Sequence, residues 1–204
     1  MTSTEISITQ GLAELKLLKS RLDSAVASGQ YVALKTKARP LDTVEFSRTA
    51  QAYFQSYSDL LNRYNRIKGA IVISNATTRV VVASKEYTVA EAIEHKRNLH
   101  MKKQMLATLQ TQLKAVQDAF ARHTNDIQAR AERLLEVELG KDGKTNVENS
   151  NQFVESFLKS NKAEIVDPLK LETLITELSK EITEFETTVD WVLSESNGRT
   201  KIIV

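Results

Sequence analysis

The chain of 204 residues has no cysteine, two prolines and six glycines. The absence of cysteine excludes disulfides, thiolate nucleophiles and cysteine-ligated metal or iron–sulfur centres. The scarcity of proline and glycine favours long uninterrupted elements, which in this chain are predicted to be helices. No run approaches the ~18–20 apolar residues of a membrane-spanning helix. The net charge of +2 is too small to indicate a nucleic-acid partner or a membrane surface.

The remaining composition is that of a chain able to bury a core, with 41% hydrophobic and 26% charged residues. The first five residues lack the basic-then-apolar order of a secretion signal. We therefore expect cytoplasmic synthesis without export by that route.

The most prominent pattern is an apolar residue at every seventh position within 88–139, a stretch that contains neither proline nor glycine. These residues are Leu99, Leu106, Leu113, Phe120, Ile127 and Leu134. The stretch predicts one helix, roughly 75–80 Å long at the usual rise per residue. A compact domain of this chain length would be only about 45 Å across, so the helix is expected to protrude, break or run along a partner.

Apolar residues three and four apart predict further helices at 5–28, 42–68, about 150–160 and 168–197. Two helix starts carry capping-box patterns, Asp42 with Glu45 and Thr88 with Glu91. The β-branched runs at 71–73 and 80–82, together with the tail at 200–204, are typical of strands.

These elements predict a mainly α fold: an elongated antiparallel helical bundle around one very long helix. Residues 70–88 and 199–204 are expected to form a small β-sheet of about three strands at one end. The whole chain, 1–204, is expected to be a single domain. An alternative is that the long helix breaks near Asn125 and folds back into a compact bundle.

The neighbouring helices are too short to cover the far half of the long helix, and an uncovered apolar stripe usually marks an interface. We therefore expect a homo-oligomer or another protein partner to be contacted by Leu113, Phe120, Ile127 and Leu134. In a coiled coil, the position three residues after each member of such a repeat is also apolar. In this chain three of those six positions are polar, Lys102, His123 and Arg130, which argues against a simple two-stranded coiled coil.

The sequence shows no constellation for catalysis, so we expect no enzyme, no cofactor and no metal. His95 and His100 are five residues apart, unlike the four-residue spacing of helical zinc ligands. A dense basic group of Lys96, Arg97, Lys102 and Lys103 is a candidate anion patch. The alternative for this group is a charged face turned to water, and we expect no nucleic-acid partner.

Three segments of the chain carry a resemblance: 61–63 (Leu-Asn-Arg), 75–79 (Asn-Ala-Thr-Thr-Arg) and 87–92 (Tyr-Thr-Val-Ala-Glu-Ala). With Asn197-Gly198-Arg199-Thr200, they resemble the DIP1984-like family, some members of which are labelled septicolysin. The resemblance implies a helical fold, and the septicolysin label implies a soluble membrane-active toxin-like protein. Residues 29–41 and the N-terminal extension depart from the family pattern.

Taken together, these patterns favour a non-enzymatic, self-assembling helical protein that serves as a building block or adaptor in a larger assembly. A virion or phage tail is one setting for small, cysteine-free, helical proteins. The alternative is the membrane-active protein that the septicolysin label implies.

Overall fold

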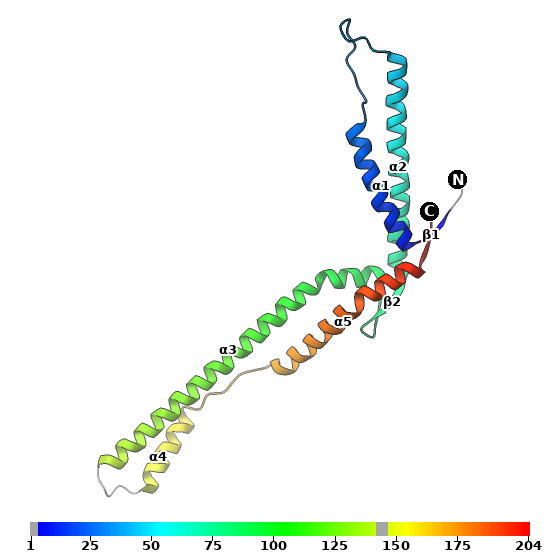
Figure 1. Ribbon diagram of the computed structural model, residues 1–204. Coiled ribbons are helices and arrows are strands. Elements are labelled where there is room, and N and C mark those ends of the chain that lie inside the picture. Colours follow the sequence, from blue (N-terminus) through cyan, green and yellow to red (C-terminus); the bar gives the residue numbers. More distant parts are fainter. Residues whose placement is uncertain (1–3, 142–146) are drawn as a thin grey trace. The chain divides into compact units, whose positions relative to one another are not determined.

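The computed structural model describes residues 4–141 and 147–204, and it confirms the prediction of a mainly α fold (Figure 1). The helices are α1 (Ile8–Ser28), α2 (Thr43–Thr77), α3 (Val89–Lys141), α4 (Val147–Ser160) and α5 (Leu171–Arg199). The strands are β1 (Glu5–Ser7), β2 (Arg79–Val82), β3 (Lys85–Thr88) and β4 (Lys201–Ile203).

The chain divides into two compact units, the first made of Met1–Asn98 with Glu184–Val204 and the second of Leu99–Thr183. Helices α3 and α5 each contribute residues to both units. The single domain over 1–204 and the antiparallel bundle around the long helix stay predictions.

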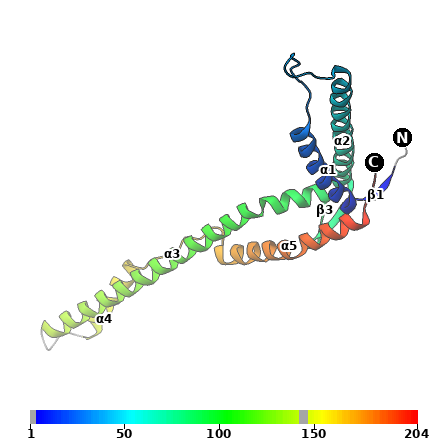
Figure 2. The same ribbon diagram turned by 45° about the horizontal axis from the view of Figure 1, so that its top comes forward.

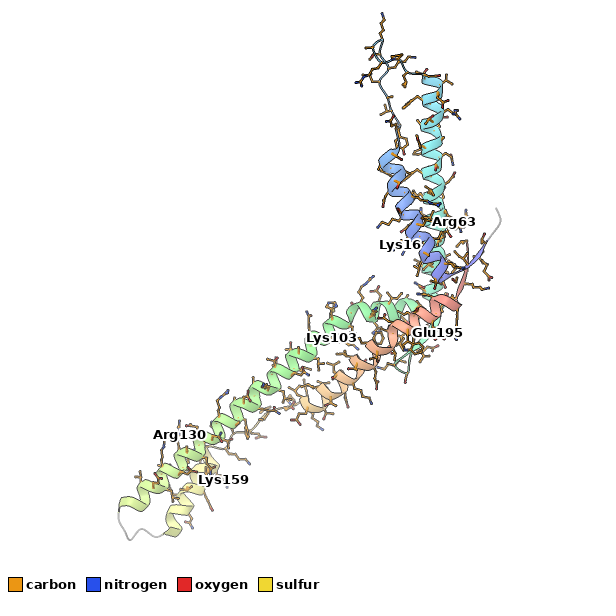
Figure 3. All side chains as sticks on the ribbon, viewed as in Figure 1. Lys16, Arg63, Lys103, Arg130, Lys159 and Glu195 are labelled. Carbon is orange, nitrogen blue, oxygen red and sulfur yellow. The ribbon has the colours of Figure 1, made fainter. Side chains whose placement is uncertain are left out.

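The first unit is built on a hairpin of α1 and α2, which lie side by side in both views (Figures 1 and 2). Its core joins the two helices to the C-terminal strand and consists of Ile8, Leu15, Leu18, Ile67, Ile71, Ile202 and Val204. Gly11 lies against this core, and a Cβ there would be at van der Waals contact, 3.4 Å, with side-chain atoms of Ile67, Ile71 and Ile202. Arg63 of α2, labelled in Figure 3, donates to Glu14 of α1 at 2.8 Å.

The strand predicted at 71–73 is wrong, because α2 continues through these residues to Thr77. Leu60, Tyr64, Ile67 and Ile71 keep the three- and four-residue spacing of one helix face, and that face packs against α1. Gly69, where the sequence predicted an end, faces open space, since a Cβ at this position would meet no atom within 4 Å. Packing therefore outweighs both the β propensity of the run and the cost of about 1 kcal/mol for a helical glycine.

The predicted three-stranded sheet is also wrong, because the strands form two separate pairs. Strand β2 pairs antiparallel with β3, and β4 pairs antiparallel with β1, so that Ile6 lies opposite Ile202. The turn between β2 and β3 consists of Ala83 and Ser84, which have φ values of 48° and 64°. Neither residue is the glycine or asparagine that such two-residue turns favour, so composition carries no turn signal at this position.

The second unit contains most of α3, the whole of α4 and the first part of α5. Helix α3 is unbroken at Asn125, so the alternative of a break there is wrong. Helix α4 lies beside α3 in both views, and Ile127 and Ala131 of α3 are buried at 8% and 4% exposure. The last helix begins at Leu171 rather than at Pro168, and the Asp167 carboxylate accepts a hydrogen bond from the Leu171 amide at 2.8 Å.

Candidate interaction surfaces

Two histidines that the sequence singled out have partners within the chain. The His95 ring lies 5.0 Å from the Tyr87 ring and 6.1 Å from the Phe185 ring, measured between centroids. The His123 Nε2 lies 3.0 Å from the carbonyl oxygen of Asn161. Within residues 4–141 and 147–204, no three histidine, aspartate or glutamate side chains gather as they would around a metal ion.

The candidate anion patch is largely neutralised by carboxylates from the chain itself. Lys96 pairs with Asp190, and the Arg97 guanidinium donates to Glu94 at 2.8 Å. Lys102 donates to Glu181 at 3.0 Å, across to α5. These pairs favour the alternative that the sequence left open, a charged face turned to water, although anion binding by Lys96, Arg97, Lys102 and Lys103 stays a prediction.

A similar pairing occurs at Arg63, where the hydrogen bond to the Glu14 carboxylate raises the pKa of the guanidinium. Both side chains keep about a third of their surface exposed. An ion pair of this exposure contributes little to stability, typically about 0–1 kcal/mol.

The seven-spaced stripe of α3 is covered unevenly within the second unit. Leu99 and Ile127 are each 8% exposed, whereas Phe120, between them, is 38% exposed. Leu113 and Leu134 are half-buried. Ile127 therefore has little surface left for a partner, because α4 covers the region that the sequence predicted to be bare. The predicted interface stays a prediction, with Phe120 as its most accessible member.

The opening at Phe120 coincides with the segment 161–170, which connects α4 to α5 without forming a helix. The first residue of the segment and the first turn of α5 after it are each hydrogen-bonded to α3, at positions on either side of Phe120. His123 contacts Asn161 at one end, and Gln117 donates to Glu172 at 3.1 Å at the other. Within the segment, Val166 is 86% exposed and Leu169 is 64% exposed. Apolar side chains of both α3 and the connecting segment are thus left open to solvent within the second unit.

A second apolar surface lies at the end of the first unit's helical hairpin, where α2 extends beyond α1. A hollow of about 810 Å³ opens between the end of α1, the loop 29–41 and the outer turns of α2. Its lining residues are Val26, Tyr31, Ala50, Gln51, Phe54, Gln55 and Tyr57. Val32 and Leu34 of the loop are 88% and 82% exposed.

No family model, curated protein or solved structure matches this chain. The resemblance to the DIP1984-like family therefore stays a prediction. Among the described residues, no helix is long and apolar enough to cross a membrane.

The surface at the hairpin end is not among the sites predicted from the sequence, although the sequence contains a signal for it. Residues 24–41 include three cations and no carboxylate, and Tyr31, Val32 and Leu34 stand immediately before the cations. The loop has no helical or strand periodicity, so a search by periodicity passes over it. Local composition, rather than periodicity, is what distinguishes this segment.

Proposed function

We propose that this chain is a non-enzymatic, self-assembling helical protein, a building block or adaptor of a larger assembly such as a virion or phage tail. The observation that supports the proposal most directly is the exposure of Phe120 on α3 and of Val166 and Leu169 in the segment 161–170. Apolar side chains gathered in this way on a surface usually mark a site of contact with another molecule.

The polar residues that stand three positions after members of the apolar stripe of α3 support the same proposal, because they are already paired within the chain. Lys102 pairs with Glu181, Arg130 pairs with Asp126 and His123 contacts Asn161. A second copy that covers Phe120 would therefore not need to supply partners for these three groups. The favourable contribution to the free energy of association would then come from burial of apolar surface, at roughly 25 cal/mol per Å² removed from water.

Size-exclusion chromatography with light scattering tests the proposal. We expect the wild-type chain to be an oligomer at micromolar concentration and the double variant Phe120→Asp/Val166→Asp to dissociate at least about tenfold more readily, because both charges would be buried in the contact. Val137→Asp, with one added charge, is the control for a charge elsewhere on α3, since Val137 is 51% exposed on the same helix. The control is expected to remain an oligomer.

A wild-type chain that is a monodisperse monomer at all accessible concentrations would contradict self-assembly. Dissociation of the Val137→Asp control to the same extent as the double variant would instead show that the contact does not lie at Phe120. Circular dichroism of each variant verifies that the helices are retained, so that dissociation is not confused with unfolding.

A further inference from the structure

The loop 29–41 presents its aliphatic side chains to solvent at the far end of the α1–α2 hairpin from β1 and β4 (Figure 1). Its course is defined by two local contacts. The Tyr31 hydroxyl donates to the Ala25 carbonyl, and the Tyr31 ring lies so close to Gly29 that a Cβ there would be 2.2 Å from the hydroxyl oxygen. Any larger residue at position 29 would require the Tyr31 ring to move.

The outer part of the loop is a turn in which Thr36 and Arg39 exchange two backbone hydrogen bonds, each 3.2 Å long. The Thr36 hydroxyl also accepts from the Arg39 amide at 3.1 Å. Lys37 stands within this turn and Lys35 immediately before it, and both side chains are exposed. The turn therefore groups three cations, Lys35, Lys37 and Arg39, at the end of the hairpin.

These three cations have no ion-pair partner in the part of the chain that the structure describes. The nearest carboxylates in the sequence are Asp23 and Asp42. The Asp42 carboxylate is used to cap α2, where it accepts from the Val44 and Glu45 amides. The end of the hairpin is thus both positive and apolar, in contrast with the paired cations of Lys96, Arg97 and Lys102.

We propose that the loop 29–41 docks on an anionic lipid surface, with Val32 and Leu34 entering the boundary between headgroups and acyl chains and the three cations contacting headgroup phosphates. Cationic residues beside exposed aliphatic residues are the combination that binds such a surface. A nucleic acid would match the charge, and the neighbouring hollow contains Tyr31 and Phe54. The most exposed side chains next to the cations are however the aliphatic Val32 and Leu34, whereas single-stranded binding sites use stacked aromatic side chains. A protein partner would need a pocket shaped for the loop, whereas a bilayer accepts aliphatic side chains without one.

Co-sedimentation with vesicles tests the charge requirement, using phosphatidylcholine alone and an equal mixture of phosphatidylcholine with phosphatidylglycerol. We expect the wild-type chain to bind the mixed vesicles and not the zwitterionic ones. In the triple variant Lys35→Gln/Lys37→Gln/Arg39→Gln, partitioning of the protein onto the mixed vesicles is expected to fall by about a hundredfold, because the attraction of three cations to the anionic surface is lost. The triple variant Lys16→Gln/Lys19→Gln/Arg21→Gln on α1 changes the net charge equally and is expected to bind as the wild type does (Lys16 is labelled in Figure 3).

The absence of native cysteine permits a direct test of insertion. A polarity-sensitive fluorophore on Val32→Cys is expected to shift its emission to the blue on mixed vesicles, while the same fluorophore on Ser20→Cys of α1 is not. The proposal is overturned if the wild type binds neither vesicle type, if it binds both equally, or if the two triple variants lose binding to the same extent. A label at Val32 that stays in water on bound vesicles overturns it as well, since the aliphatic residues then have no part in docking.

Discussion

The Nε2 atom of His123 lies 3.0 Å from the carbonyl oxygen of Asn161, so that the middle of α3 is connected to the residue that follows α4. The Asn161 side chain in turn donates to the Phe157 carbonyl at 2.8 Å, which completes the last turn of α4. This arrangement gives His123, which stands next to the apolar stripe of α3, a structural partner. It also places the end of α4 where it covers the Ile127 region and leaves Phe120 uncovered.

Replacement of His123 by alanine is expected to loosen the segment 161–170. The lost hydrogen bond should lower the free energy of unfolding by about 1 kcal/mol. Hydrogen exchange should become faster in this segment, while Gln112→Ala, an exposed change on the same helix, should leave the exchange as it is. Unchanged exchange in His123→Ala would mean that the contact does not hold the segment.

Ile202 and Ile203 are neighbours on β4 with opposite environments, and their replacement by alanine should have unequal effects. Ile202 is 5% exposed in the core of the first unit, whereas Ile203 is 71% exposed. Ile202→Ala is expected to lower the free energy of unfolding by about 2–5 kcal/mol, the usual range for a buried isoleucine. Ile203→Ala should change it by less than about 0.5 kcal/mol. Urea denaturation measures both, and equal effects would contradict the packing of β4 against α1 and α2.

Glu91 should make the stability of the chain depend on pH in the acid range. Its carboxylate accepts the backbone amide hydrogen of Thr88 at 2.6 Å, and this bond, followed by the one to the Thr88 side chain, lowers the pKa of Glu91 below its ordinary value of 4.5. A lowered folded-state pKa gives a stability contribution that is fully present above pH 4.5 and is lost as the pH falls through the lowered value.

The variant Glu91→Gln removes this contribution. It should therefore be less stable than the wild type at neutral pH, and the difference should shrink below pH 4.5 and disappear once the pH is below the lowered pKa of Glu91. Thermal unfolding as a function of pH measures this, with Glu132→Gln, exposed on the same helix, as the control. A difference between Glu91→Gln and wild type that persists in acid would show that another interaction of the side chain is responsible.

Helix starts could be predicted from the sequence because capping is local. The Asp42 carboxylate accepts from the Val44 and Glu45 amides as expected, and Thr88 and Glu91 form the predicted reciprocal pair. The pattern at Asp42 is only half of a capping box, because the Glu45 carboxylate accepts from the Arg48 guanidinium rather than from the backbone amide of Asp42. That hydrogen bond lowers the pKa of Glu45.

Long-range pairings could not be predicted in the same way. The run at 71–73 has the composition of a strand, and its helical state depends on contacts between Ile71 and residues of α1. Strand β4 pairs with β1, whose residues Glu5, Ile6 and Ser7 are too few to carry a strand pattern. The segment 29–41 has no periodicity, and the hollow beside it exists because α2 extends beyond α1.

The sequence by itself determined the helical class, the long helix α3 over the proline- and glycine-free stretch 88–139 and the capped starts of α2 and α3, because these depend on residues within a few positions of one another. The tertiary structure decided which apolar side chains stay exposed. Exposure of a side chain depends on the length and position of whatever packs beside it. For this reason Ile127 is buried by α4, while Phe120, seven residues earlier in the same repeat, remains open to solvent.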